Sequence, residues 1–408
     1  MADVTLEPEA MTDSAAAHEE PKRLYLDNAA TSFPKPAAVL EAMTHYATKL
    51  GASAGRGAYA EAIETGELLA KCRAAVNRLI GGTSPEHCVF ALNCTDGLNI
   101  ALRGLIDPFK PGHAVCTEVD HNSILRPVHA MADQWKLEFT AAKVDPKTTI
   151  VDPQAIKNAI RPDTKYVAIT HASNVTGAVQ PIREIGKICR EMAVPLIVDA
   201  AQSLGHVAID VEADCIDVLA APGHKAAMGP LGTGFLYLRP GMEKHVRPLR
   251  EGGTGSRSDL PTHPETMPDR YEPGSHNAIG LAGLLAGLEW IEKKGLDQII
   301  EHEAALVQVM IDGLIGIENL AYHGPAGVAD RIGVFSFRVA GYAPHELSAV
   351  LESGFGILSR SGIHCAPWVH RALGTLDDGG TTRLSFGPFV TQQDVRYAAD
   401  ALAQVAQG

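Results

Sequence analysis

The sequence predicts an α/β protein, with a large domain built on a mostly parallel sheet and a smaller α+β domain after it. The chain has 408 residues, 46% of them hydrophobic and 20% charged, which is ordinary globular composition and long enough for two cores. From about Glu86 to Leu238, short apolar runs alternate with amphipathic segments. This alternation is typical of parallel strands joined by helices that cover both faces of a sheet.

The apolar runs are rich in Val, Ile and Ala, as is typical of strands that are buried on both faces. We expect these strands at residues 88–92, 114–117, 165–170, 195–200, 216–220 and 234–238. Helical spacing between them predicts helices at 95–106 and 182–193. Loops that follow the strands of such a sheet usually carry the ligand chemistry.

The pattern changes after the last of these strands. Residues 251–277 are rich in Gly, Pro and Ser with little periodicity, which indicates a long loop of the kind that is usually functional or mobile. A long helix is expected at 278–295, and strands at 334–339 and 382–386 then indicate a smaller α+β domain. The predicted organisation is a disordered acidic tail (1–22, with a weak helix as the alternative), a large domain (23–290) and a small C-terminal domain (291–408).

Charge, hydropathy and cysteine content narrow the class of protein. The formal net charge is −13, and an acidic chain argues against nucleic-acid binding, which needs a basic face. No apolar run reaches the length of a membrane span, and the N-terminus lacks the pattern of a signal peptide. The seven cysteines include no C-x-x-C pair and are odd in number, which argues against a zinc site or a disulfide framework. We expect a cytoplasmic protein without a membrane partner.

Two side chains in post-strand loops suggest a cofactor site. Asp199 ends the apolar run "LIVD", where it could cap the next element or pair with a cationic ligand. Lys225 lies in "APGHKAAMGPLGTGF", a loop of small residues between two predicted strands. An isolated lysine is usually a surface charge, but a desolvated one has a lowered pKa and can react with an aldehyde. His224 beside it could donate a hydrogen bond to an anion.

Three further segments carry candidate side chains. Thr95 and Asp96 open a predicted helix, where hydroxyl and free N–H groups can bind phosphate or simply form an N-cap. His121 follows another strand, and a lone histidine is more often structural than catalytic. Cys365 lies in "SRSGIHCAPWVH", where Arg360 and His364 could favour its thiolate. No carboxylate or second cysteine completes a metal site there, so no metal is predicted.

Together these side chains require a phosphorylated ligand with a cationic ring nitrogen and an aldehyde, and pyridoxal 5′-phosphate (PLP) has these groups. Lys225 would hold the aldehyde and Asp199 the ring nitrogen, while Thr95 and His224 would hold the phosphate. The spacing of "GPLGTG", which leads into a strand, disfavours the alternative of a nucleotide-binding dehydrogenase.

At this point the sequence resembles a known family, the class V branch of fold-type I PLP enzymes, and within it the cysteine desulfurase and selenocysteine lyase group. The motifs that carry the resemblance occur in the expected order from about Leu24 to Asp394: "LYLDNAATSFPKP", "LNCTDGLN", "HASNVTGAVQPI", "VDAAQS", "GHK", "GPLGTGFLYL", "YEPGSHN" and "RSGIHCAP". The resemblance implies a seven-stranded, mostly parallel sheet between helices and a homodimer.

The resemblance also assigns roles to single residues. It implies that Gln202 binds the phenolic oxygen of PLP, that His121 stacks on the ring, and that Ser275 reaches the phosphate from a second subunit. The residues implied to bind substrate are Asn174, Arg383, Arg360 and Arg56. Asn174 also belongs to the implied cofactor site, together with Thr95, Asp96, Asp199, His224 and Lys225.

The implied activity is that of a PLP-dependent cysteine desulfurase, a sulfurtransferase that converts L-cysteine to L-alanine. Lys225 would remove the Cα proton, His121 would donate a proton, and Cys365 would take the sulfur as a persulfide for an acceptor protein. The alternatives are a selenocysteine lyase, a C–S β-lyase, a transaminase, or a non-enzymatic PLP-binding or sulfur-trafficking protein. A lyase that eliminates its leaving group would not need Cys365.

The sequence departs from the family pattern in three places. Pro222 replaces a hydroxyl residue that binds phosphate in many desulfurases, and Ser275 stands where Thr is commoner. The segment after Cys365 differs in length and character from the best-known desulfurases, which leaves the sulfur acceptor and the substrate open.

Overall fold

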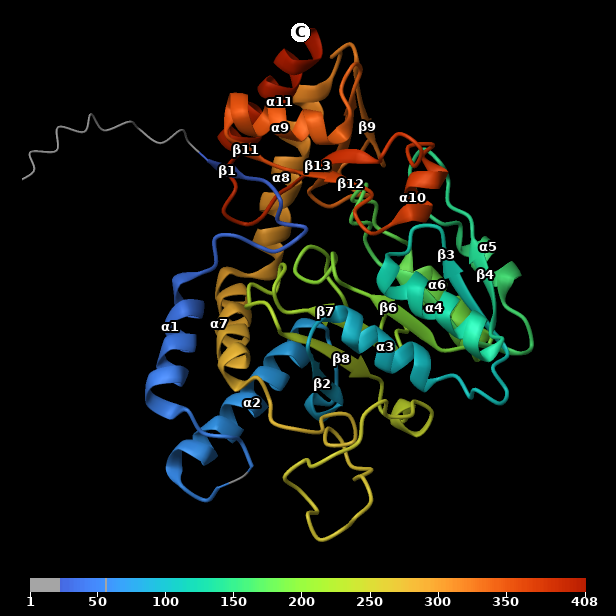
Figure 1. The fold of residues 1–408 in the computed structure, drawn as a ribbon, viewed down its shortest axis with the longest axis vertical. Coiled ribbons are helices and arrows are strands. Elements are labelled where there is room, and N and C mark those ends of the chain that lie inside the picture. Colours follow the sequence, from blue (N-terminus) through green and yellow to red (C-terminus); the bar gives the residue numbers. More distant parts are fainter. Residues whose placement is uncertain (1–22, 56) are drawn as a thin grey trace, which may run out of the picture.

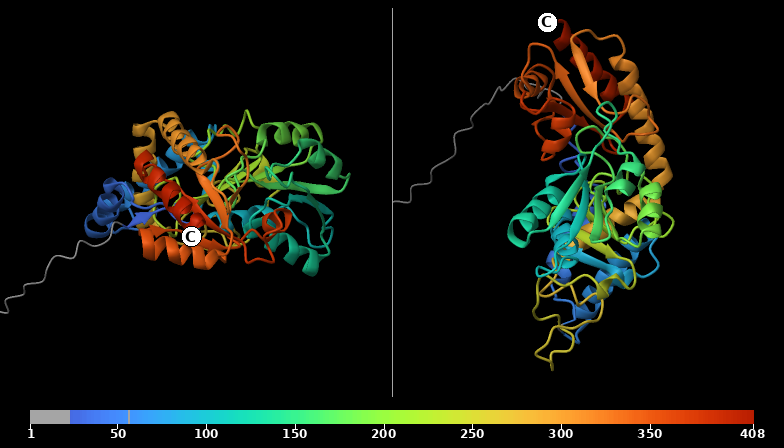
Figure 2. Two further views of the ribbon diagram at one scale, coloured as in Figure 1. Left: turned by 90° about the horizontal axis from the view of Figure 1, so that it is seen from above. Right: turned by 90° about the vertical axis from the view of Figure 1, so that its right-hand side faces the viewer.

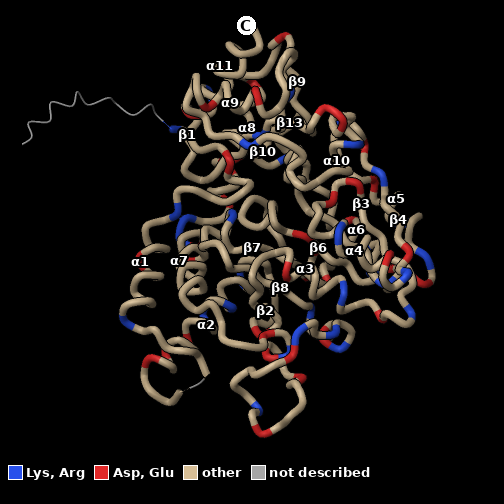
Figure 3. Tube along the Cα trace, viewed as in Figure 1, with Lys and Arg blue, Asp and Glu red and all other residues tan. Residues whose placement is uncertain are grey.

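The computed structural model describes residues 23–55 and 57–408, which form two lobes (Figure 1). The predicted tail, residues 1–22, and the candidate substrate residue Arg56 lie outside the described residues. Figure 2 shows the two lobes from further sides, with residues 251–277 at the end farthest from the C-terminal lobe. Lys and Arg are interspersed with Asp and Glu over both lobes (Figure 3).

The large lobe is built on a seven-stranded sheet, as expected, in the order β2-β8-β7-β6-β5-β3-β4. Only β8 is antiparallel to its neighbours, which confirms the mostly parallel sheet. The strands are β2 (Cys88–Ala91), β3 (His113–Thr117), β4 (Glu138–Ala142), β5 (Thr164–Thr170), β6 (Leu196–Asp199), β7 (Val218–Pro222) and β8 (Gly234–Leu238).

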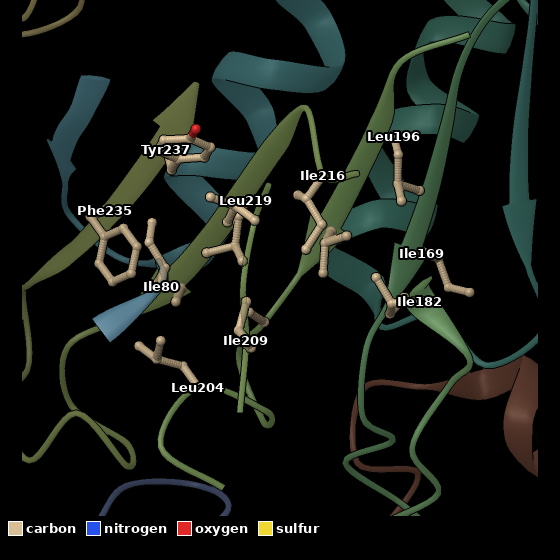
Figure 4. Close-up of a cluster of buried hydrophobic side chains, with 14 of the residues drawn as sticks. Ile80, Ile169, Ile182, Leu196, Leu204, Ile209, Ile216, Leu219, Phe235 and Tyr237 are labelled. Carbon is tan, nitrogen blue, oxygen red and sulfur yellow. The ribbon is translucent and has the colours of Figure 1, made fainter. Parts of the chain in front are cut away.

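Helices cover both faces of this sheet, because its strands are apolar on both sides and must be buried on both. Successive residues of a strand point to opposite faces, so Val198 packs in one core and Ile197 in the other. Figure 4 shows part of the first core, where Ile182 of a covering helix lies beside Ile169 of β5, while Leu219 and Phe235 lie farther along the sheet. The helices of this lobe are α1 (Ala37–His45), α2 (Ala60–Leu79), α3 (Cys94–Gly104), α4 (Asn122–Trp135), α5 (Pro153–Ala159), α6 (Ile182–Glu191) and α7 (Ala278–Lys294).

The C-terminal lobe has a four-stranded antiparallel sheet in the order β12-β13-β10-β9 and a core of its own. Its strands are β9 (Leu320–His323), β10 (Val334–Val339), β12 (Arg360–Gly362) and β13 (Thr381–Ser385), and its helices are α8 (Leu296–Leu314), α9 (Pro344–Phe355), α10 (Pro367–Ala372) and α11 (Gln392–Gln407). β1 (Leu24–Tyr25) pairs in parallel with β11 (Ile357–Leu358), so Leu24 and Leu26 join this core. The first described residues therefore pack in the C-terminal lobe. The predicted domain boundary near residue 290 stays a proposal.

The long predicted loop, residues 251–277, contains no helix or strand. A buried ion pair fixes its C-terminal end to the large lobe: both guanidinium NH groups of Arg73 on α2 donate to the Glu272 carboxylate, at 2.6 and 2.5 Å. Glu272 also accepts a hydrogen bond from the Phe90 backbone N–H of β2. This loop is thus held at its end, just before α7 begins.

Candidate functional site

A pocket of about 200 Å³ opens at the carboxyl ends of β5, β6 and β7, where the topology of a parallel sheet favours ligand binding. It collects most of the side chains that the sequence singled out, although they come from five separate segments. The pocket is lined by Asn93, Cys94, Thr95, His121, Ser123, Thr170, Asn174, Asp199, Ala201, Gln202, Pro222, His224 and Lys225.

Asp199 is the last residue of β6 and is only 1% exposed. Its Oδ1 accepts hydrogen bonds from the Ala201 backbone N–H at 2.9 Å and from the Cys94 thiol at 3.3 Å. Burial, together with this carboxylate, raises the pKa of Cys94 well above its usual value, so Cys94 stays a neutral thiol. Both bonds use Oδ1, which leaves Oδ2 available to a cationic group of a ligand.

Lys225 follows β7 and lines the same pocket as Asp199. Burial lowers the pKa of Lys225, while the attraction of Asp199 partly opposes that shift. A lowered pKa increases the fraction of free amine, which is the nucleophilic form. The backbone is fixed from the N-terminal segment: Ser32 donates to the Lys225 carbonyl at 2.7 Å, and Lys35 donates to the His224 carbonyl at 2.8 Å.

His224 precedes Lys225 in the chain and also lines the pocket. Burial, with the nearby Lys225 and Lys35, lowers its pKa to about 4, so its imidazole is neutral at pH 7. Its buried Nδ1 has no hydrogen-bond partner within the described chain. A buried polar atom of this kind costs free energy until a ligand or water pairs with it.

His121 and Thr95 are joined by a residue that the sequence analysis missed. Ser123 Oγ lies 2.7 Å from Thr95 Oγ1 and 2.8 Å from His121 Nδ1. His121 is the N-cap of α4 and Ser123 is in the first turn of that helix. The segment "DHNS" could have identified Ser123. A residue two positions after a helix N-cap lies beside the cap side chain, and here the N-cap is His121.

Gln202 and Asn174 also line the pocket, and one side-chain N–H of each donates to a backbone carbonyl. Gln202 Nε2 donates to the Ala29 carbonyl at 2.9 Å. Asn174 Nδ2 donates to the His364 carbonyl at 2.6 Å, while its buried Oδ1 has no partner among the described residues. Asn174 therefore connects the pocket to the loop that carries Cys365.

Cys365 is exposed and does not line the pocket, although hydrogen bonds connect its loop to residues of the pocket and of α4. The Cys365 carbonyl accepts from the Asn122 N–H at 2.8 Å, and Arg360 lies 3.9 Å from the thiol. The structure corrects the expectation that His364 favours the thiolate. His364 is 3% exposed and hydrogen-bonded to Thr381, and burial lowers its pKa well below 6.5, so it carries no positive charge at pH 7.

Arg383, on β13, is fully buried next to Asn174. Its guanidinium donates to the Asn174 carbonyl at 3.0 Å and to the Asp27 carboxylate at 2.5 Å, and its Nε has no partner in the described residues. Asp27 was not predicted as a site residue. Asp27 lies more than sixty positions before the first segment of the pocket. It neither ends a predicted sheet strand nor begins a predicted helix, and these were the local patterns that identified the other candidates.

Two predicted cofactor residues lie apart from the pocket. The Asp96 carboxylate accepts from the Leu92 N–H at 3.0 Å and pairs with Arg250 at 3.1 Å, so it faces a second hollow. This is physically reasonable, because a carboxylate beside Thr95 would repel a phosphate. Ser275 is exposed and lines the same second hollow, of about 150 Å³.

Within residues 23–55 and 57–408, no cluster of three or more His, Cys, Asp or Glu side chains is arranged to hold a metal, and no helix is long and apolar enough to cross a membrane.

The chain is similar to known proteins over most of its length. The family model described as Aminotransferase class-V matches residues 24–397. Proteins named probable cysteine desulfurase from Methanothermobacter thermautotrophicus and Pyrococcus abyssi are 33% and 34% identical, each over 94% of both chains. Among solved structures, the apo cysteine desulfurase of Thermococcus onnurineus NA1 aligns over 95% of both chains with a TM-score of 0.87 and 33% identity. A cysteine desulfurase of Escherichia coli aligns over 94% of both chains with a TM-score of 0.82 and 25% identity.

Proposed function

This chain belongs to the class-V aminotransferase family, and from that premise we propose that it is a PLP-dependent cysteine desulfurase. It converts L-cysteine to L-alanine and transfers the sulfur to Cys365. The observation that carries the proposal is the arrangement of Lys225 and Asp199 on one pocket, with an exposed thiol on a loop tied to that pocket through Asn174.

The residues of the pocket fit PLP. Asp199 offers a buried carboxylate to a protonated ring nitrogen, and Lys225 offers an amine to the aldehyde. His224 Nδ1 and Asn174 Oδ1 are buried polar atoms whose partners a polar cofactor would supply. The N–H groups at the start of α3, next to Thr95, would hold the phosphate, since the first N–H groups of a helix have no partner within it. When bound, PLP supplies the electron sink that acidifies the substrate's Cα–H bond.

The protein's own groups then move protons and sulfur. The Lys225 amine, whose pKa is lowered by burial, accepts the Cα proton. The Cys365 thiolate forms an S–S bond to the substrate sulfur as the Cβ–S bond breaks and leaves its electron pair with the carbon skeleton. One proton delivered to Cβ and one returned to Cα then complete alanine. Arg360, 3.9 Å from the Cys365 thiol, places a positive charge beside the attacking sulfur. Sulfur is left as a persulfide on Cys365, from which an acceptor protein takes it.

Binding of the substrate carboxylate falls to the region of Arg383 and Asn174. Arg383 is a fully buried cation with an Nε that has no partner in the described chain, so it can receive a second carboxylate besides Asp27. Arg360 adds a further positive charge beside Cys365. This places the carboxylate end of cysteine near the loop whose thiol must reach its sulfur.

We propose that the active unit is a homodimer. Ser275 does not line the pocket of its own chain, but it is exposed at the fixed end of residues 251–277, where it can reach a partner's phosphate site. Apolar side chains beside this hollow, Leu92 at 57% and Leu231 at 68%, are exposed and would be covered by a second copy. Ser275→Ala should then weaken PLP retention, and a strictly monomeric protein with full PLP occupancy in sedimentation would contradict the dimer.

The deciding experiment measures alanine and sulfide released from L-cysteine, selenocysteine and cystine in parallel. Lys225→Ala should lose nearly all turnover of every substrate. Cys365→Ala should lose about 100-fold or more in alanine release from L-cysteine, because a thiol is a poor leaving group that must be taken by a nucleophile. Selenocysteine turnover should fall far less, since a selenol leaves more easily.

Cys215→Ala is the matched control, because Cys215 is the other cysteine of the described chain that is not buried. It should keep full activity. If Cys365→Ala released alanine from L-cysteine at the wild-type rate, the desulfurase proposal would be wrong. The activity would then belong to a β-eliminating or transaminating enzyme, or to a selenocysteine lyase if selenocysteine were the only good substrate.

A further inference from the structure

A chain of three polar side chains crosses the pocket wall from α3 to α4. Thr95 Oγ1 lies 2.7 Å from Ser123 Oγ, which lies 2.8 Å from His121 Nδ1. All three residues line the pocket that contains Lys225 and Asp199. Neither the family match nor the motif resemblance gives Ser123 a role.

The direction of each hydrogen bond in this chain can be worked out from one fixed donor. The Ser123 backbone N–H lies 3.1 Å from His121 Nδ1, and a backbone N–H can only donate. Nδ1 is therefore an acceptor and carries no proton. It follows that the Ser123 hydroxyl donates to Nδ1 and accepts from the Thr95 hydroxyl. The proton of the neutral ring is on Nε2, the nitrogen that these bonds leave open to the pocket.

The surroundings keep the ring neutral. Burial lowers the pKa of His121 to about 4, and the positive charges of Lys225, Arg360 and Arg126 act in the same direction, while Asp199 opposes them. Between pH 5 and pH 8 the imidazole is therefore uncharged, and its tautomer decides whether it can donate a proton to the pocket.

From this geometry we infer that Ser123 is a positioning residue, which holds His121 as a neutral imidazole with its proton on Nε2, directed at the reacting atoms. The tautomer is a property of the chain alone, while its use in proton delivery to the substrate rests on the proposed desulfurase function. The sequence feature that carries the inference is the pair His121 and Ser123 on the first turn of α4, with Thr95 facing them from α3.

The test compares Ser123→Ala with Ser123→Thr, which keeps the hydroxyl. Histidine ring ¹⁵N spectra of the labelled protein, with the His121 signal assigned from His121→Gln, report the tautomer and pKa directly. Ser123→Ala should raise the pKa of His121 by about one unit, because a donor to the neutral ring is lost, and should leave the ring a mixture of tautomers. Ser123→Thr should restore both. The matched control is Ser348→Ala, which removes a serine hydroxyl that accepts a hydrogen bond from Ser359 at 3.0 Å, on the C-terminal lobe.

Kinetics give a second readout. At pH 8, where the ring is neutral in every variant, Ser123→Ala should lower kcat for L-cysteine about tenfold with KM nearly unchanged, because only the rings that keep their proton on Nε2 can donate it to the pocket. PLP retention should stay within about twofold of wild type. A loss of PLP with an unchanged His121 spectrum would overturn the inference and make Ser123 a phosphate ligand. If no variant or wild type released alanine, the proposed function would fail, and the spectra would still decide the role of Ser123.

Discussion

At the scale of single residues, the pocket illustrates which side chains a sequence can identify. Lys225, Asp199, Thr95 and His121 each follow a strand, and the carboxyl ends of parallel strands meet at one edge of a sheet. Local pattern was therefore enough to predict that they lie together. It could not show where a side chain points, which is why Asp96 was placed with the phosphate although its carboxylate turns to Arg250.

Asp27 and Arg383 form the contact that only the folded chain could reveal, since they are 356 positions apart. Because Arg383 is fully buried, removing its carboxylate partner leaves an uncompensated buried charge. Asp27→Asn should lower the free energy of unfolding by about 3 kcal/mol. In a double-mutant cycle with Arg383→Met, the coupling energy should exceed about 2 kcal/mol.

The control for this prediction is the exposed pair of Arg338 and Asp378, at 2.7 Å with side chains 40% and 50% exposed. Exposed ion pairs contribute little, so the same cycle there should give less than about 1 kcal/mol. Urea unfolding of the four variants in each cycle measures both values. Equal coupling at the two sites would mean that burial of Arg383 does not strengthen its ion pair.

At the scale of elements, the buried strands of the large sheet were predicted, including β2 at one edge, and the exposed strand at the other edge was not. β6 and β7 are continuous apolar runs, because both faces are covered. β4 alternates exposed and part-buried residues and ends the sheet, so it gives no apolar run. β1 was missed for a different reason: a two-residue strand is defined by its partner β11, 333 positions later, and not by its own sequence.

The long loop gives a prediction at this scale. Glu272 accepts two bonds from Arg73 and one from the Phe90 N–H, so it holds the end of residues 251–277 that precedes α7. Glu272→Ala should cost about 3–5 kcal/mol in the free energy of unfolding, because it leaves the Arg73 guanidinium buried without its partner. Because the end of the loop is then released, a protease should cleave residues 251–277 faster in limited proteolysis under native conditions.

Glu292→Ala is the matched control for Glu272→Ala. Glu292 also pairs with an arginine of α2, Arg78, but both side chains are more than half exposed. That variant should change stability by less than about 1 kcal/mol and leave proteolysis of the loop unchanged. If both variants were cut at the same rate, the anchoring role of Glu272 would be refuted.

At the scale of the whole molecule, the mostly parallel sheet followed from the alternation of apolar and amphipathic segments up to Leu238, and the second lobe from the change of pattern after it. The way the lobes are tied together did not, because it depends on contacts across the whole chain. His206, after β6, pairs with Glu303 of α8 at 2.8 Å, and Glu303 also accepts from the Gly333 N–H at 2.8 Å. These bonds join the loop after Asp199 to the C-terminal lobe, so the pocket and the Cys365 loop are parts of one connected structure.

Buried titratable groups in both lobes make the stability of the whole molecule depend on pH. Burial lowers the pKa of His171 and His370 to about 4, whereas a histidine of the unfolded chain titrates near 6.5. Between these values the unfolded chain binds more protons than the folded one, so these histidines destabilise the fold as pH falls from 6.5 to 4.

Asp120 acts in the opposite direction. Burial raises its pKa to about 7, so the folded chain binds the extra proton and gains stability as pH falls from 7 towards 4.

Because His121 and His224 also have pKa values near 4, these four histidines outweigh Asp120 and His206, whose pKa is raised because the Glu303 carboxylate overcomes the opposing effect of burial. The free energy of unfolding in urea should therefore be lower at pH 5 than at pH 7, by more than about 2 kcal/mol. Asp120→Asn removes the opposing contribution, so its loss between pH 7 and pH 5 should be larger than that of wild type, whatever the variant's stability at pH 7. A wild-type protein that became more stable on going from pH 7 to pH 5 would show that these histidines are not held neutral by burial.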